Sequence, residues 1–275
     1  MAIETPVRRG RGRPRSTAES SSAGAVQSLD RALKLLKLVA AADGLSLTEL
    51  SQRAGFPPST AHRLLMTLQS HGIVDFIEER QQWAVGVEAY RIGSAFQRRA
   101  QVAEVGRAVM HDLMEASGET VNLAIADDGD VIFISQVETH EAIRAFFRPG
   151  SRGPMHASGI GKALLAELSD QKVKALLQAK GLAGFTDKTI VDTARLAAEL
   201  ETTRKRGWAL DDEERTLGMR CVAAPIYNEY GEAVAGISVS GPSVRIPDER
   251  IGELGPQVKR AAEQITKSIG GRAPR

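Results

Sequence analysis

The apolar positions in the first third of the chain repeat with the spacing of amphipathic helices. A first helix is predicted from near Val26, because apolar residues follow the i, i+4, i+7, i+11 spacing of one helix face at Leu29, Leu33, Leu36 and Ala40. Ser46–Glu49 has the pattern of a capping box, which predicts a second, short helix that ends at Gly55. A third helix is predicted after Pro57 and Pro58, with its apolar stripe at Ala61, Leu64, Leu65 and Leu68.

Two short strand-like runs follow the third helix. Ile73–Ile77 and Gln82–Val85 flank the polar residues Glu78–Arg80, which is the pattern of a hairpin. Three helices followed by a hairpin is the element order of a winged helix-turn-helix. The next segment, about Val87 to Gln97, has a helical apolar stripe and is interpreted as a linker or dimerisation helix.

Strands and helices are mixed in the rest of the chain. After a helix over about 102–117, the pattern predicts strands at 121–126 and 131–137, helices at 160–168, 170–179 and 192–206, a hairpin of 222–227 with 233–240, and a terminal helix at 247–268. This mixture predicts an α+β chain whose larger domain has a mixed sheet of the kind found in sensor domains.

The composition fits an ordinary globular protein. With 275 residues the chain is long enough for two domains, and 42% hydrophobic and 25% charged residues exclude a chain disordered throughout, a collagen and a coiled-coil rod. Cys221 is the single cysteine, which excludes an intrachain disulfide framework and fits a reducing cytosol. No apolar run approaches the ~18 residues of a membrane span and no secretory signal is visible, so we expect a cytoplasmic protein without a membrane partner.

The net charge of +2 is unevenly distributed. Residues 1–24 contain five arginines and two glutamates among Gly, Pro and Ser, and are predicted to form a disordered basic tail. Within it, Arg11-Gly12-Arg13-Pro14 is similar to the core of an AT-hook, in which Arg11 and Arg13 enter a narrow A·T minor groove. The alternative is a plain basic tail that is solvated, or that binds DNA without sequence preference.

The third predicted helix has the position of a recognition helix. Its apolar stripe is committed to the core, and the remaining face carries the candidate DNA-binding residues Ser59, Thr60, His62, Arg63 and Thr67. Hydroxyls and the helix N-terminus suit phosphates, and Arg63 has the length to reach a guanine edge. The alternative is a generic three-helix core with a polar outer face or a protein-binding role.

A run of small residues leads into the helix predicted at 160–168. Exposed N–H groups at such a helix start attract a carboxylate or a phosphate, although Pro154–Ala163 matches neither a Walker A loop nor a dinucleotide-binding motif. The alternative is a tight helix start packed on a sheet. Ser238 and Ser240 lie on one face of the last strand, and together with Gly159, Asp211 and Cys221 they form a candidate polar pocket.

Two other kinds of site use some of the same residues. In an enzyme, Cys221 would be a nucleophile with His156 as its base and Asp211 as the orienting group. In a metal site, His140, His156, Cys221 and an aspartate would be the ligands. Neither arrangement has a diagnostic spacing in the sequence.

The sequence resembles the IclR-type transcription regulators over nearly its whole length after the tail. The motifs that carry the resemblance are the helix-turn-helix at 46–75, Met155–Ala163, Thr203–Gly207, Asp211–Glu214, Leu217–Pro225 and Ile237–Pro242. The C-terminal half is most similar to the isocitrate lyase regulator branch, which senses glyoxylate and pyruvate.

The resemblance implies a GAF-like effector-binding domain after the winged helix-turn-helix, and dimers or dimers of dimers that bind an inverted-repeat operator in promoter DNA. The implied domains are the tail (1–24), the DNA-binding domain (25–86), a linker helix (87–104) and the effector domain (105–272). No cofactor and no catalytic activity are implied, and the effector would be glyoxylate or a similar small 2-oxo acid. A nucleoid-associated protein that acts through its tail is a further alternative, and it would not respond to an effector.

Carried over by position, the implied effector pocket consists of Gly159, Ile160, Asp211, Cys221, Ser238 and Ser240, with Ala142 and Ala145 on an apolar wall. Ala142 and Ala145 are smaller, and Ile160 is larger, than the residues of the glyoxylate-sensing branch at these positions. The pocket is therefore expected to differ in shape from that of the branch.

Overall fold

The structure is a computed structural model that describes residues 26–42, 44–99 and 101–274, with the backbone alone described at 94–99 and 101. Its contacts divide the chain into two compact units between Ser94 and Ala95, and each is described by itself. The basic tail and its Arg11-Gly12-Arg13-Pro14 motif lie outside the described residues. In the part of the chain that is described, no helix is long and apolar enough to cross a membrane.

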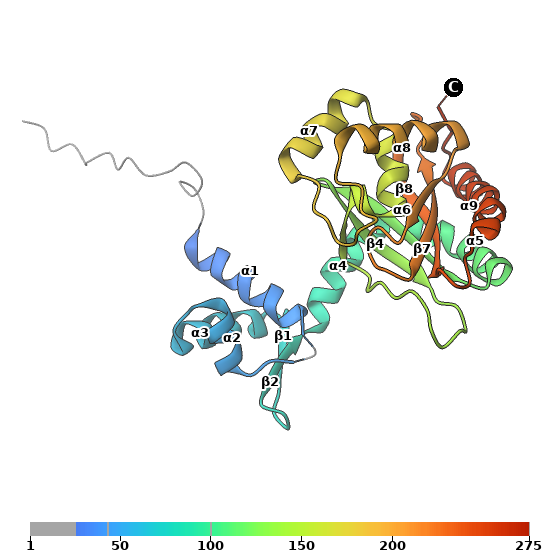
Figure 1. The fold of residues 1–275 in the computed structure, drawn as a ribbon. Coiled ribbons are helices and arrows are strands. Elements are labelled where there is room, and N and C mark those ends of the chain that lie inside the picture. Colours follow the sequence, from blue (N-terminus) through green and yellow to red (C-terminus); the bar gives the residue numbers. More distant parts are fainter. Residues whose placement is uncertain (1–25, 43, 100, 275) are drawn as a thin grey trace, which may run out of the picture. The chain divides into compact units, whose positions relative to one another are not determined.

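The first unit is a winged helix-turn-helix, as the sequence predicts (Figure 1). It consists of α1 (Gln27–Ala40), α2 (Leu47–Ala54), α3 (Pro58–Ser70), and a two-stranded antiparallel sheet of β1 (Val74–Ile77) and β2 (Gln82–Val85). Ser46 and Glu49 cap α2 reciprocally, so the predicted capping box is confirmed. Gly55 ends the helix in the left-handed conformation that a residue without Cβ adopts at no steric cost.

The buried face of α1 differs from the stripe that its spacing predicts. Leu35 and Val39 are fully buried, whereas Leu29 is 57% and Leu33 is 46% exposed. The helix has so many apolar residues that two overlapping stripes fit a period of 3.6 residues. Packing against α2 and α3 selects the stripe that contains Leu35.

The second unit is built on a six-stranded antiparallel sheet with strand order β5-β4-β3-β8-β7-β6. The strands are β3 (Thr120–Asp127), β4 (Asp130–Val137), β5 (Arg152–Pro154), β6 (Ala209–Asp212), β7 (Met219–Tyr227) and β8 (Ala233–Pro242). The helix α4 (Val87–Arg99) crosses the boundary between the units. The fold class predicted from the sequence, a winged helix-turn-helix followed by an α/β domain, is confirmed, but the sheet of the larger domain is antiparallel throughout and the expected mixed sheet is wrong.

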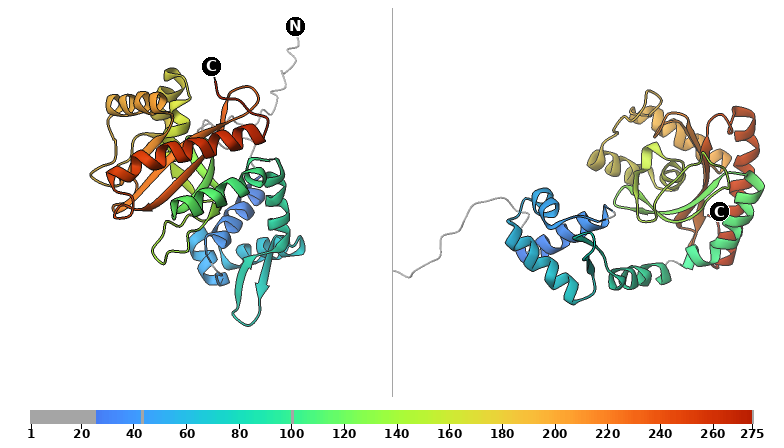
Figure 2. Two further views of the ribbon diagram at one scale, coloured as in Figure 1. Left: turned by 90° about the vertical axis from the view of Figure 1, so that its right-hand side faces the viewer. Right: turned by 90° about the horizontal axis from the view of Figure 1, so that it is seen from below.

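Helices cover both faces of this sheet (Figures 1 and 2). The long helices α5 (Gln101–Ser117) and α9 (Asp248–Ser268) pack together against one face. On the other face lie α6 (Gly159–Ala166), which follows the short 3-10 helix η1 (Met155–Ala157), then α8 (Thr193–Arg206), with α7 (Asp170–Lys180) farther out.

The alternation of side chains along β7 and β8 divides the core into two layers. Val222, Ile237 and Val239 point to the side of α5 and α9 and join the apolar cluster there. The residues between them therefore point to the side of α6. Ala223, on β7, belongs to the apolar cluster on that side, and Ser238, on β8, has the same orientation.

Only glycine fits at two positions at the start of α6, one of them against β7 and the other against η1. A Cβ atom at Gly159 would lie 2.7 Å from Sγ of Cys221, and one at Gly161 would collide with the backbone of Met155. All eight residues of α6 are buried. The predicted tight helix start packed on a sheet is therefore present, and it places the N-terminus of α6 beside β7.

Candidate functional site

A cavity of about 570 Å³ opens on the α6 side of the sheet. Most of the pocket residues named from the sequence line it: Gly159, Ile160, Asp211, Cys221, Ser238, Ser240 and Ala145. Ala142 does not line the cavity and is exposed to solvent, so its expected place on the apolar wall is wrong. The loop between β4 and β5 has no regular structure, and here it turns Ala145 inward and Ala142 outward.

Strand register gathers the polar residues from three strands. Cys221 on β7 pairs with Asp211 on β6 at one side and with Ser240 on β8 at the other. Ser238 lies two residues from Ser240 and so faces the same side of the sheet. Residues from three segments that are far apart in the sequence thus lie in one row across the sheet. The two-residue spacing of Ser238 and Ser240 predicts only that these two serines share a face of β8, and it does not predict their neighbours on β6 and β7.

Two serine hydroxyls of the cavity have hydrogen-bonding capacity that the described residues leave unused. The Ser238 hydroxyl is buried beside the thiol of Cys221 and makes no hydrogen bond to an oxygen or nitrogen atom of the described residues. Ser240 Oγ accepts a hydrogen bond from Nδ2 of Asn122 at 3.2 Å, which leaves its own hydrogen for another acceptor. An anion that accepts from both hydroxyls would satisfy a polar group whose burial otherwise costs free energy.

The first turn of α6 adds backbone donors. Ser158 caps the helix, because its Oγ accepts from the N–H of Gly161 at 3.1 Å and its carbonyl accepts from the N–H of Lys162. The N–H groups of Gly159 and Ile160 precede these capped positions at the positive end of the helix. The arrangement is that of a helix N-terminus suited to a carboxylate, as predicted from the small residues in this stretch.

Asp211 is the acidic group of the cavity. It is 8% exposed, and its Oδ1 accepts a hydrogen bond from the N–H of Glu214 at 2.8 Å. Burial, together with the nearby charge of Glu214, raises the pKa of Asp211 to about 7. Near neutral pH the carboxyl is therefore protonated in a large fraction of molecules. The protonated form donates a hydrogen bond and does not repel an anion.

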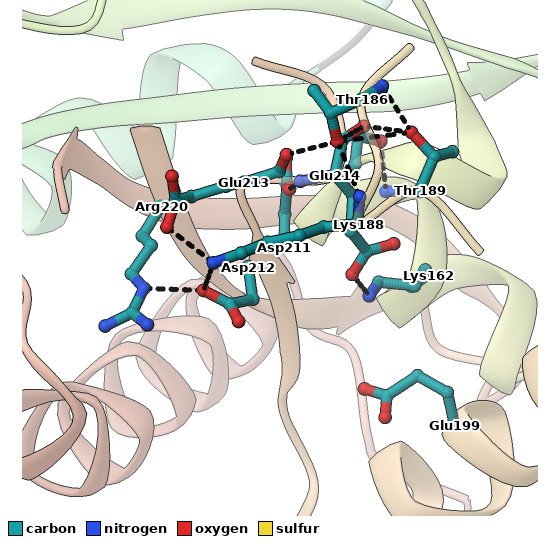
Figure 3. A network of polar contacts seen from close by, with 12 residues as sticks. Lys162, Thr186, Lys188, Thr189, Glu199, Asp211, Asp212, Glu213, Glu214 and Arg220 are labelled. Carbon is teal, nitrogen blue, oxygen red and sulfur yellow. Dashed lines mark hydrogen bonds and ion pairs between the residues drawn. The ribbon is translucent and has the colours of Figure 1, made fainter. Parts of the chain in front are cut away.

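The loop that follows Asp211 is held by a buried ion pair (Figure 3). Lys162 on α6 is fully buried, and its Nζ pairs with the carboxylate of Glu214, which is 4% exposed. Burial raises the pKa of Glu214, and the positive charge of Lys162 acts in the opposite direction. The pair joins the first turn of α6 to the loop between β6 and β7.

A second segment, 186–189, joins this loop from the other side (Figure 3). Thr189 Oγ1 donates to the carbonyl of Glu214 at 2.6 Å, and Thr186 Oγ1 donates to the carbonyl of Glu213 at 2.8 Å. Lys188 pairs with the carboxylate of Glu213 at 2.6 Å. Sequence reasoning missed this network, because its members come from three segments with no common spacing.

The environment of Cys221 does not favour a nucleophile. Burial and the nearby Asp211 raise the pKa of its thiol to about 11, so the reactive thiolate is scarce at neutral pH. Nε2 of His156, the expected base, lies 2.9 Å from the carbonyl oxygen of Ala183 and is engaged there. The expectation of a Cys221–His156–Asp211 enzyme site therefore has no support in the geometry.

The expected metal ligands are also dispersed. His140 is exposed and lies 3.5 Å from the carboxylate of Glu115, whereas His156 is buried. Among the described residues, no group of three or more His, Cys, Asp and Glu side chains is placed to hold a metal ion. The structure does not bring His140, His156 and Cys221 together as a ligand set.

The cavity walls include basic residues that sequence reasoning did not find. Arginines from the β4–β5 loop, β5, the β6–β7 loop and β7 line the cavity, at Arg144, Arg148, Arg152, Arg215 and Arg220. Loops contribute three of them, and no periodic pattern in the sequence signals which loop residues face inward. Another hollow of about 570 Å³ lies between α7 and α8, with the apolar residues Val173, Leu177, Leu196 and Leu200 in its walls.

The candidate DNA-binding residues of the first unit share the outer side of α3. Ser59, His62 and Arg63 are exposed, and Thr60 is half-buried. Thr67 is exposed too, but its hydroxyl donates to the carbonyl of Arg63 at 3.0 Å. At the tip of the β1–β2 hairpin, Glu78 and Glu79 are exposed, and their charge does not suit phosphate. Arg11 and Arg13 lie outside the described residues.

Two family models match the chain. Residues 28–77 match the IclR helix-turn-helix domain, and residues 95–267 match the model described as bacterial transcriptional regulator IclR C-terminal. The HTH-type transcriptional regulator BhcR of Paracoccus denitrificans is 49% identical over 270 residues, covering 97% of this chain and 96% of that protein. The transcriptional repressor IclR of Escherichia coli is 45% identical, with 97% and 98% covered.

The similarity extends to a more distant relative and to solved structures. The repressor AllR of Escherichia coli is 37% identical over 98% of this chain and 99% of that protein. The crystal structure of the Thermotoga maritima IclR superimposes with a TM-score of 0.76 at 29% identity, covering 89% of this chain and 99% of that one. The C-terminal domain of Escherichia coli KdgR gives 0.56 at 29% identity, with 62% and 98% covered.

The raised pKa of Asp211 predicts how stability depends on pH. The folded state prefers the protonated carboxyl of Asp211. The stability that this preference contributes is complete below the ordinary pKa of about 4 and is lost as pH rises through about 7. Asp211→Asn removes this titration. The free energy of unfolding of the variant minus that of wild type should therefore be about 3 kcal/mol larger at pH 8 than at pH 5, measured by urea denaturation.

The matched control is Asp187→Asn, which removes an exposed carboxylate from the neighbouring segment. It should follow wild type at both pH values. If Asp211→Asn also followed wild type at both, Asp211 would ionise in the fold as it does in the unfolded chain.

Proposed function

The chain belongs to the IclR family of bacterial transcriptional regulators, and from this premise we propose that it senses glyoxylate or a similar short 2-oxo acid and represses its target promoter. The family makes it a DNA-binding transcription regulator and not an enzyme. Repression is proposed because relatives at 45% and 37% identity are named repressors.

The buried hydroxyl of Ser238, which makes no hydrogen bond to an oxygen or nitrogen atom of the described residues, is the observation that carries the ligand proposal. Gly159, Ile160 and Ser240 line the cavity with it, and we propose that their N–H and O–H groups bind one small anion together with Ser238. A carboxylate supplies the acceptors that these donors need, and a hydrogen bond to a charged group is stronger than one between neutral groups. The proposed ligand places its carboxylate here.

Asp211 complements the other end of a 2-oxo acid. In its protonated form the carboxyl donates to the oxo oxygen, and in its ionised form it accepts from the hydroxyls of a hydrated aldehyde. Its hydrogen bond from Glu214 links the ligand to the loop that Lys162 holds. A ligand that binds one arrangement of this loop more tightly than another shifts the protein toward that arrangement, which is the basis for a change in DNA affinity.

The proposed DNA contacts follow from α3 and from the tail. Arg63 and its exposed neighbours on α3 are proposed to read the operator, and Arg11 and Arg13 of the tail to add affinity at flanking A·T sequence. A single helix-turn-helix buries little surface, so we propose that a homodimer, or a dimer of dimers, binds an inverted repeat. Such a regulator acts where promoter DNA is found, in the bacterial cytoplasm.

The ligand proposal predicts the effect of removing one hydroxyl. Ser238→Ala should weaken glyoxylate binding by about ten- to a hundredfold, since a hydrogen bond to a carboxylate contributes roughly 1.5–3 kcal/mol. Isothermal titration of the full chain measures this effect. Ser243→Ala, which removes a half-buried hydroxyl just beyond the end of β8, is the matched control and should bind as wild type does. Glyoxylate binding that is equal in both variants would place the ligand elsewhere.

The DNA proposal predicts the effect of truncating Arg63. Arg63→Ala should reduce operator affinity by about 1–3 kcal/mol if the guanidinium contacts a base, with a smaller loss on non-specific DNA. Fluorescence anisotropy with both DNA types separates the two effects. Arg195→Ala, an exposed arginine of α8 in the other unit, should leave both affinities unchanged. Unaltered operator binding by a folded Arg63→Ala would remove Arg63 from the interface.

A further inference from the structure

The walls of the cavity carry more positive charge than a monocarboxylate neutralises. Among the described residues that line it, Asp211 is the single acidic one, against five arginines. Three of these arginines have carboxylate partners: Arg144 pairs with Glu138, Arg152 with Asp127, and Arg220 with Asp212. Arg148 and Arg215 form no ion pair within the described part of the chain, so two cationic groups face the cavity without compensation.

Of these two, Arg215 is held in a defined position. Its guanidinium lies 4.0 Å from the ring centre of Phe185, the distance of a cation–π contact. The Phe185 ring stacks in turn on His156 at 6.0 Å, and His156 is fixed by its contact with the Ala183 carbonyl. A side chain ordered in advance loses less conformational entropy when it binds a ligand.

The backbone places Arg215 at the edge of the polar pocket. The carboxylate of Asp211 accepts hydrogen bonds from the N–H groups of both Glu214 and Arg215. Arg215 therefore starts beside Asp211 and lines the cavity, and its exposed side chain places the guanidinium over the Phe185 ring. The cavity volume of about 570 Å³ is in the range of sites for much larger ligands, so a two-carbon acid in the polar pocket leaves this wall uncovered.

We propose that Arg215 is a second anion-binding position in the cavity, and that the ligand class extends to short 2-oxo dicarboxylic acids. One carboxylate binds at Gly159, Ile160 and the two serines, and the second binds the guanidinium of Arg215. The planar guanidinium donates two parallel N–H groups to a carboxylate, which a lysine does not reproduce. This inference rests on the proposed function, because it takes the polar pocket as the site of the first carboxylate.

A matched pair of four-carbon acids tests the inference with the full chain. Freshly dissolved oxaloacetate has a second carboxylate where 2-oxobutyrate has a methyl group, and isothermal titration measures the ratio of their affinities. In wild type, oxaloacetate should bind at least tenfold more tightly. In Arg215→Gln the ratio should fall toward one, with 2-oxobutyrate affinity within threefold of wild type.

Two further variants and a control separate charge from geometry. Arg215→Lys should keep only part of the preference for oxaloacetate, and Phe185→Leu, which removes the supporting ring, should reduce it while leaving the charge in place. Arg195→Gln, on the exposed side of α8, should keep the wild-type ratio. Circular dichroism confirms that each variant is folded.

The outcomes distinguish this inference from the proposed function. Equal affinity for the two acids in wild type, a ratio retained in Arg215→Gln, or no binding of either acid would overturn the role of Arg215. If glyoxylate binding still depended on Ser238 in that case, the proposed function would stand without the second position. If oxaloacetate bound through Arg215 while glyoxylate and 2-oxobutyrate did not bind, the second position would stand and the monocarboxylate ligand would fail.

Discussion

The buried ion pair between Lys162 and Glu214 is the interaction on which the arrangement of the cavity depends. Two charges removed from water must stay paired, because leaving one of them without its partner costs several kcal/mol. Lys162 is fully buried in α6, so Glu214 must remain beside it. That requirement fixes the β6–β7 loop against the helix start, and with it the two neighbours of Glu214 that face the cavity, Asp211 and Arg215.

The close approach of α6 to β7 completes the site. Gly159 lies where any side chain would meet Sγ of Cys221, and this brings the first N–H groups of the helix to the serine-bearing face of the sheet. The N–H groups of the helix start and the serine hydroxyls of β8 are suited to binding an anion, and they provide no nucleophile or base that would react with it. The thiol of Cys221 keeps its proton because its pKa is raised, and His156 is engaged by a backbone carbonyl. A sensor needs such a pocket, in which the ligand is held and released unchanged.

Local patterns in the sequence were sufficient for most of the elements, although not for the short strands β5 and β6, and for half of the site. The capping box at Ser46, the hairpin after α3 and the alternation of Ser238 and Ser240 each depend on neighbours within a few residues, and each is present in the structure. The residues themselves indicated Gly159 and Asp211 as pocket candidates, the resemblance to a known family added Ile160, and all three line the cavity.

The rest depends on contacts between distant segments. Lys162 and Glu214 are 52 positions apart, and neither residue carries a local sign of its partner. The inward face of α1 was set by packing against α2 and α3, since two apolar stripes satisfy the same period. Ala142 and Arg215 lie in loops, where no periodicity tells which side chain turns toward a cavity.

Amide hydrogen exchange of the full chain, with and without glyoxylate, tests most directly whether this cavity is the sensing site. Ligand contacts at the start of α6 and at the loop that the Lys162–Glu214 pair holds should slow exchange in residues 159–162 and 211–216. Exchange between α7 and α8, where the other hollow lies, should be unaffected. Protection confined to α7 and α8, with no change at 159–162 and 211–216, would contradict the account.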